Sequence, residues 1–255
     1  MPDVRSQALD GFGKAAQAYS RGRPEYPEEV LEWLSRSLDI GPGKTALDLG
    51  AGTGKFTKWL LRTQANVIAV EPVEAMRAEL AADLPHVRAL SGTAQAMPLG
   101  DATCDAVVCA QAFHWFATQG ALAEIHRVLK PAGKLGLLWN VRDETVDWVA
   151  AITRIISPYE GDAPRYYTGE WRRALTGNLF TDLDEECFVY QHVGTAQTVI
   201  LDRVLSVSFI AALPDEARSK VADRLKDLIA SHPAIKGRES IAFPYHTHAF
   251  SCSRR

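Results

Sequence analysis

The chain has 255 residues, of which 47% are hydrophobic and 23% are charged. These proportions are typical of a folded globular protein and exclude a disordered, fibrous or disulfide-rich chain. The length suffices for one large α/β domain or two small ones. The formal net charge of -3 gives no overall positive field, and the basic pairs are scattered, so nucleic acid is not an expected partner.

Cysteine usage and the N-terminal sequence bear on the cellular compartment. The four cysteines show no C-x-x-C spacing and lie in apolar segments, which favours reduced core thiols over zinc ligands or disulfides. Residues 1–7 lack the apolar run of a signal peptide, and the most apolar later stretch is interrupted by Asp202 and Arg203. We therefore expect a soluble, cytoplasmic protein with no membrane partner, either a monomer or a dimer.

The first half of the chain predicts a helical cap followed by strands that alternate with helices. Residues 8–38 have helical patterns, with Pro27 suited to a helix start. From residue 46, short apolar runs alternate with longer amphipathic stretches, which indicates parallel βαβ units. The expected strands are 46–49, 67–70, 87–90, 106–110 and 134–139, and the expected helices begin near 54, 74 and 119.

The second half predicts an insertion and the last strands of the same sheet. A helix at 143–156 and a turn-rich stretch precede Tyr166, Tyr167 and Trp171, which we interpret as an insertion over one sheet edge that walls a substrate pocket. The remaining expected elements are a strand at 187–193, helices at 197–212 and 214–230, and a strand at 241–250.

The expected fold is thus α/β: a doubly wound, mostly parallel, seven-stranded Rossmann-like sheet with helices on both faces, an N-terminal helical cap and an insertion after the fifth strand. No linker-like tract divides the chain, so we expect a single domain over 1–255, with the cap at 1–40, a core at 41–140 and the remaining elements at 141–255. A separate C-terminal domain is left open.

A glycine-rich turn, Gly50-Ala51-Gly52-Thr53-Gly54, follows the first strand and precedes a helix. Such a turn presents backbone N–H groups and the positive end of a helix to a ligand, which can approach closely because glycine has no Cβ. A phosphate-binding P-loop would need glycine where Leu49 stands and Ser or Thr where Phe56 stands. A dinucleotide fingerprint would need a third glycine at Lys55. The spacing therefore disfavours phosphate and pyrophosphate ligands.

Two carboxylates flank this turn. Asp48 lies in the strand just before it, where a negative charge would repel pyrophosphate and attract an ammonium or sulfonium group. Glu71 ends the second strand, 21 positions after Gly50, the distance at which doubly wound folds place a carboxylate against ribose hydroxyls. Together they favour an adenosine ligand with a cationic group.

At this point the sequence resembles the class I S-adenosylmethionine-dependent methyltransferases, in particular the small-molecule group that includes the trans-aconitate and ubiquinone-biosynthesis types. The segments 46–57, 67–76, 92–99 and 106–116 with 129–133 resemble the motifs of that family in order and spacing. Four motifs in the right order on the right predicted elements are far more specific than any one of them.

The resemblance implies S-adenosylmethionine as the cofactor and assigns residues to it. The glycines of the turn would line the methionine part, and Glu71 would accept hydrogen bonds from the ribose. Pro72 or Met76 would pack near adenine, and Thr93 departs from the aspartate that many members use to accept from the adenine amine. The residue pattern and the resemblance, taken together, give this set of expected cofactor residues: Asp48, Gly50, Ala51, Gly52, Gly54, Glu71, Pro72, Met76, Thr93, Ala94, Ala110 and Gln111.

The acceptor is expected to be a small molecule methylated at oxygen, with nitrogen and carbon left open. The methyl group of the donor is already activated, so a general base is needed only when the acceptor loses a proton. His114 follows the fourth strand and is the candidate base, because strand ends of open α/β sheets face the crevice. The candidate substrate residues are Tyr19, Arg23, Tyr26, Trp115, Trp139, Asn140 and Arg142.

Two other functions and one metal site are considered. An NAD-dependent oxidoreductase agrees with Glu71 but not with the glycine spacing, and a non-catalytic cofactor-binding protein on the same fold stays open. His246 and His248 share one face of a predicted strand, but no third ligand is near them in sequence, so no metal site is expected.

Overall fold

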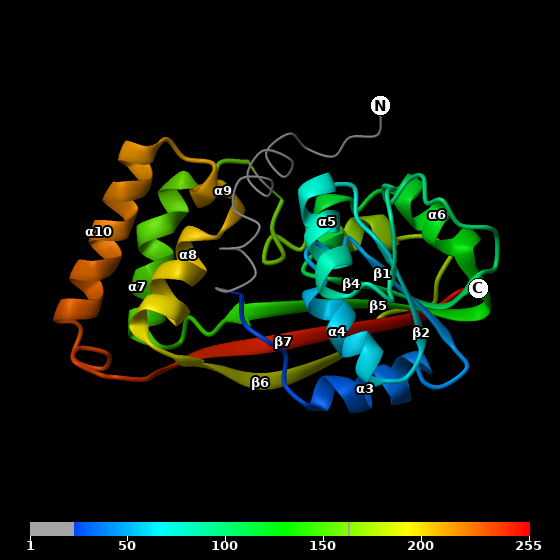
Figure 1. Cartoon of the computed structure of the whole chain (residues 1–255), viewed down its shortest axis with the longest axis horizontal. Helices are drawn as coiled ribbons and strands as arrows, with labels where there is room; N and C mark the ends of the chain where they lie inside the picture. Colours follow the sequence, from blue (N-terminus) through cyan, green and yellow to red (C-terminus); the bar gives the residue numbers. More distant parts are fainter. Residues whose placement is uncertain (1–22, 163) are drawn as a thin grey trace.

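A computed structural model describes residues 23–162 and 164–255 (Figure 1). Seven strands form one sheet in the order β3-β2-β1-β4-β5-β7-β6. The strands β1 to β5 pair in parallel, whereas β7 runs antiparallel to both β5 and β6. This topology confirms the expected mostly parallel, Rossmann-like sheet. The strand bounds are β1 Thr45–Leu49, β2 Asn66–Val70, β3 Arg88–Leu90, β4 Cys104–Ala110, β5 Leu129–Arg142, β6 Asp184–Gly194 and β7 Ile241–Ser253.

Helices cover both faces of the parallel strands, because those strands bury both of their faces. In β4, Ala106 and Val108 pack with helices α3 and α4, while Val107 and Cys109 pack with α6 on the other side. Helix α5 packs through Leu80 against Ala51, in the turn after β1, and against Ala69 of β2. These helices span Glu29–Leu38 (α3), Lys55–Arg62 (α4), Glu74–Asp83 (α5) and Gln119–Val128 (α6).

A second group of helices packs against the long antiparallel strands. Helices α7 (Asp147–Ile156) and α10 (Asp215–Ser231) share an apolar cluster with Phe243 and Tyr245 of β7. Figure 1 shows α7, α8 (Arg203–Leu205) and α10 gathered at one end of the sheet, away from α4, α5 and α6. No helix among the residues described has the length and apolar character needed to cross a lipid bilayer.

The expected single helix at 197–212 is wrong. The chain forms a π-helical segment, η4 (Gln197–Asp202), then α8, and then a separate short helix, α9 (Ser208–Ala211). The β-branched run Thr198-Val199-Ile200 has weak α-helix propensity, and Val207 adopts an extended conformation between α8 and α9. Short π-helical segments occur frequently at functional sites, and this one places Arg203 directly after it.

The insertion after the fifth strand packs over the sheet interior. Trp171, in the short helix η3 (Glu170–Leu175), lies 4.6 Å from Trp139 of β5 and 5.1 Å from Phe250 of β7, between ring centroids. Strand β6, not β5 or β7, forms the outer edge. The expected insertion exists, but it covers β5 and β7 inside the edge strand, because its tryptophan is buried among their aromatic side chains.

Helix α3 fits against β5 only because residue 136 is glycine. A Cβ atom there would lie 2.5 Å from Leu38 Cδ1 and 3.1 Å from Trp33 Cη2. We expect Gly136→Ala to lower the free energy of unfolding by about 1–3 kcal/mol, since overpacking displaces buried side chains. Gly41→Ala, where a Cβ meets nothing within 4 Å, is the control. Equal denaturant midpoints for the two variants would contradict this packing.

Candidate functional site

The glycine turn joins β1 to α4 with a backbone that other residues rarely adopt. Gly50 and Gly54 have φ values of 75° and 85°. A Cβ at Gly50 would lie 2.8 Å from the Cβ of Ala112, and one at Gly54 would lie 2.9 Å from Leu80 Cγ. At Gly52 the nearest atom to such a Cβ is Met76 Sδ, at 3.9 Å. The outer glycines therefore allow tight packing, and the central one keeps an open approach.

Glu71, directly after β2, connects the end of that strand to the glycine turn by a hydrogen bond. Its Oε2 accepts from Gly52 N at 2.9 Å, and its Oε1 accepts from Val73 N at 2.8 Å. Burial raises the pKa of Glu71, and the two backbone hydrogen bonds act in the opposite direction. Each carboxylate oxygen has further capacity to accept a hydrogen bond, so the same side chain can hold the turn and receive ligand hydroxyls.

Asp48 is a buried carboxyl group with one oxygen unused. Its Oδ2 accepts from Thr57 Oγ1 at 2.7 Å, whereas Oδ1 is buried without a hydrogen-bond partner in the described chain. Burial raises the pKa of Asp48 to about 7. A buried, unpartnered oxygen is costly unless a donor satisfies it, and a cationic group would do so best.

A small cavity of about 50 Å³ lies against the turn and Asp48. Backbone and side chains at the ends of β1, β4 and β5 line it, among them Gln111, which has a φ of 58°. The expected cofactor residues in its wall are Asp48, Gly50, Ala51, Gly52, Ala110 and Gln111. The expected cofactor residues outside its wall are Gly54, Glu71, Pro72, Met76, Thr93 and Ala94.

Thr93 provides a second unused oxygen. Its Oγ1 is buried without a hydrogen-bond partner among the residues described, and its backbone pairs with Ala96. Thr93 and Asp48 lie in the segments expected to contact the two ends of S-adenosylmethionine. Their unsatisfied oxygens, together with Glu71 and the open face of Gly52, fit an adenosine ligand with a cationic head group.

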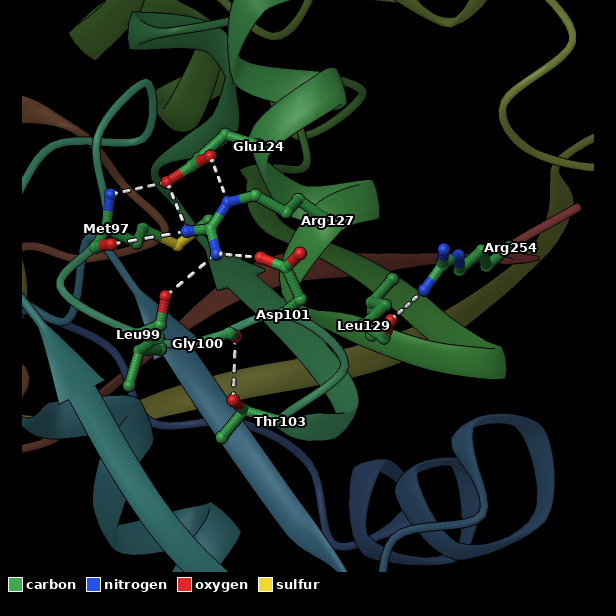
Figure 2. Close-up of polar contacts among 9 residues, drawn as sticks. All are labelled: Met97, Leu99, Gly100, Asp101, Thr103, Glu124, Arg127, Leu129 and Arg254. Atoms are coloured by element: carbon green, nitrogen blue, oxygen red, sulfur yellow. Dashed lines mark hydrogen bonds and ion pairs between the residues drawn. The ribbon is translucent and has the colours of Figure 1, made fainter.

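Arg127 of α6 holds the loop that follows Thr93, as Figure 2 shows. Its guanidinium donates to Leu99 O at 2.9 Å and pairs with Asp101 and Glu124, each at 2.7 Å. Glu124 Oε1 in turn accepts from Met97 N at 2.8 Å. No sequence pattern predicted this network: Glu124 and Arg127 are neighbours on one turn of α6, but only the fold brings them to Met97, Leu99 and Asp101.

A larger cavity of about 610 Å³ adjoins the small one, and the two share Arg23, Gln111, Asn140 and Arg203. The expected residues His114, Trp115, Trp139, Asn140, Arg142 and Arg23 all line it. Tyr26 lines only the small cavity, where it packs edge-on to Phe56. Tyr19 lies outside the described residues. Tyr166 and Tyr167, from the insertion expected to wall a substrate pocket, also line the larger cavity. Arg165, Arg203 and Phe209 line it too, and no sequence pattern pointed to them.

His114 accepts a hydrogen bond from Trp139 Nε1 at its Nδ1, at 3.0 Å. Because the indole nitrogen can only donate, Nδ1 has no proton and the neutral ring has its proton on Nε2. Burial, then the charges of Arg165 and Arg23, lower the pKa of His114 to about 3. A catalytic role for His114 stays a prediction, and these contacts favour a hydrogen-bond donor over a proton acceptor.

Trp139 and Asn140 also have structural contacts. Trp139 is 1% exposed and packs with Tyr166, Trp171 and Phe250. Asn140 donates to Glu25 O at 2.9 Å and accepts from Thr247 at 2.6 Å. Its Nδ2 thus holds the backbone at Glu25 beside the end of β5, and its Oδ1 is bound by Thr247 of β7.

The two histidines of β7 make separate contacts. His246 lies 3.4 Å from Asp143 Oδ2, and His248 lies 3.1 Å from Glu185 Oε1. Within the described part of the chain, no group of three or more His, Cys, Asp or Glu residues is placed to hold a metal ion.

The raised pKa of Asp48 predicts a pH-dependent stability. An acid with a folded-state pKa above its unfolded value binds more protons when folded, so the free energy of unfolding falls as pH rises from about 4 to about 7. We expect Asp48→Asn to remove this contribution to the decrease in the free energy of unfolding with pH. Urea unfolding of the ligand-free protein at several pH values measures it. Parallel pH profiles for the two proteins would show that Asp48 ionises normally.

The Arg127 network predicts local order in residues 93–103. Arg127→Met removes the donors that hold this loop, so we expect faster amide hydrogen exchange there than in the unchanged chain. Arg224→Met, at an exposed position of α10, is the matched control. Unchanged exchange in Arg127→Met would mean that the loop is held by other contacts.

Comparisons with known proteins show the family of the chain. A methyltransferase domain family matches residues 47–137, which span β1 through most of β5. An uncharacterized methyltransferase of Mycobacterium tuberculosis is 41% identical over 236 residues, 92% of each chain. An uncharacterized methyltransferase-like protein of Schizosaccharomyces pombe is 38% identical over 247 residues, 96% of each chain.

A solved structure supports the fold independently. A methyltransferase assigned to an antibiotic biosynthesis pathway of Anabaena variabilis superposes with a TM-score of 0.64 at 20% identity, over 91% of this chain and 98% of that one. The alternatives of an NAD-dependent oxidoreductase and a non-catalytic binding protein find no support among these relatives. The chain belongs to the class I S-adenosylmethionine-dependent methyltransferases.

Proposed function

We propose that the protein transfers the methyl group of S-adenosylmethionine to an oxygen atom of a small molecule bound in the larger cavity. The observation that carries this proposal is the junction of the two cavities at Gln111 and Asn140, at the carboxyl ends of β4 and β5. Ligands of open α/β sheets bind at such strand ends. A donor whose methionine end enters the small cavity would meet an acceptor in the larger cavity there.

The charge of the larger cavity supports an oxygen acceptor. Four arginines line it, against two carboxylates. Glu160 is paired with Arg165 and accepts from Tyr167, and Glu144 accepts from Thr153. The excess positive charge favours acceptors with anionic oxygen and disfavours ammonium groups. The lining arginines are Arg23, Arg142, Arg165 and Arg203.

When bound, S-adenosylmethionine supplies an activated methyl group that is open to in-line displacement. The residues of this chain then bind, orient and exclude water. Asp48 Oδ1 would receive the cationic amino group, Glu71 would receive the ribose hydroxyls, and Thr93 would contact the adenine edge. His114 would donate a hydrogen bond from Nε2 to the acceptor, and a carboxylate acceptor requires no base.

Glu71 is the residue that most directly tests the cofactor assignment. We expect Glu71→Gln to weaken S-adenosylmethionine binding by about ten-fold, because hydrogen bonds to a charged acceptor are stronger than those to an amide. Glu74→Gln, at an exposed position on α5, is the matched control. Titration calorimetry on both variants measures the effect, and equal affinities would remove Glu71 from the site.

The oxygen assignment is tested by incubating the protein with a metabolite extract and S-adenosylmethionine labelled in its methyl group. We expect label in an ester or ether, identified by mass spectrometry and, for an ester, by its loss in mild base. Label in a methylamine or a new carbon–carbon bond would contradict the oxygen assignment and leave the methyltransferase assignment intact.

A further inference from the structure

Two arginines and a tyrosine from separate elements meet beside the larger cavity. Arg142 ends β5, and Tyr245 is its register partner on β7, so their side chains share one face of the sheet. Arg203 follows the π-helical segment, and its neighbour Val204 packs in the same apolar cluster as Tyr245. Arg142 and Arg203 line the cavity.

Three buried polar atoms of this group, in Arg203 and Tyr245, have no hydrogen-bond partner among the described residues. Nε and Nη1 of Arg203 and the hydroxyl of Tyr245 are buried without a hydrogen-bond partner among the described residues, and Tyr245 is 0% exposed. Burial and the positive charge of Arg203 lower the pKa of Arg142. The two partly buried guanidinium groups thus repel each other, which is costly unless an anion lies between them.

Two other arginines of the chain have the hydrogen bonds and ion pairs expected of a structural guanidinium group. Arg127 donates to two backbone carbonyls and two carboxylates, and Arg165 pairs with Glu160 and donates to Pro164 O. Nearby Glu144 and Glu160 are engaged by Thr153, Arg165 and Tyr167. Among residues 23–162 and 164–255, Arg203 has no comparable set of acceptors, which distinguishes it from these two arginines.

We propose that Arg142, Arg203 and Tyr245 form a subsite that binds an anionic oxygen group of the methyl acceptor, a carboxylate or a phosphate. Guanidinium groups have only donors, and a phenol can donate, so the complementary ligand is an acceptor with negative charge. Arg142 lines only the larger cavity, Arg203 lines both cavities, and Tyr245 lies behind them without lining either. Because Arg142 belongs to the larger cavity alone, we assign the subsite to the acceptor and not to the cofactor. This inference rests on the proposed function.

The test is titration calorimetry of the whole chain saturated with S-adenosylhomocysteine, with succinate, inorganic phosphate and uncharged succinamide as probes. We expect at least one anion to bind, succinamide not to bind, and Arg203→Gln and Arg142→Gln to weaken anion binding by about ten-fold or more. Tyr245→Phe preserves the packed ring and is expected to have a smaller effect in the same direction. Arg154→Gln, at an exposed position of α7, is the control and is expected to change nothing.

The outcomes are distinguishable. Binding of succinate alone assigns a carboxylate ligand, binding of phosphate alone assigns a phosphate, and either supports the subsite. No anion binding, or anion binding that the variants leave unchanged, overturns it without affecting the methyltransferase assignment. An equal loss of S-adenosylhomocysteine affinity in folded Arg203→Gln also overturns it, because the arginine would then serve the cofactor carboxylate. Failure of the unchanged protein to bind S-adenosylmethionine would instead contradict the proposed function.

Discussion

The attachment of the glycine turn to the end of β2 is the constraint on which the site depends. Gly50 N and Ala51 N donate to Val70 O at 2.9 and 3.2 Å, and Gly52 N donates to Glu71 at 2.9 Å. Three consecutive amides of the turn are thus held by the neighbouring strand. This arrangement fixes the open face of Gly52 beside Asp48, and it sets the distance between the two carboxylates that are proposed to hold the cofactor.

The larger cavity, proposed to bind the methyl acceptor, is formed by elements far apart in the sequence. The parallel strands present their ends to the cavity, but the opposite walls come from the insertion, from α7 and from the segment around α8 and α9. Aromatic rings pack around Trp139 in tilted and edge-on contacts, and its indole N–H also selects the tautomer of His114. A packed aromatic cluster therefore determines both the shape of the cavity and the hydrogen-bonding character of its wall.

The strands and the glycine turn on the cofactor side follow from local patterns in the sequence. The apolar runs around Leu47, Val67 and Val107 indicate buried parallel strands, and the spacing of Gly50, Gly52 and Glu71 follows from the turn they form. The acceptor half depends on contacts between residues far apart in sequence. Arg203 is visible in the sequence only as a charge inside an apolar run, and neither the π-helical segment before it nor its position facing Arg142 follows from periodicity.

The most direct measurement of the central claim is a crystal structure of the protein with S-adenosylhomocysteine. We expect the ribose hydroxyls within hydrogen-bond distance of Glu71 and the amino group at Asp48 Oδ1. We expect the sulfur atom to be directed toward the junction of the two cavities at Gln111 and Asn140. A ligand bound elsewhere, or one whose ribose and amino groups contact neither carboxylate, would contradict it.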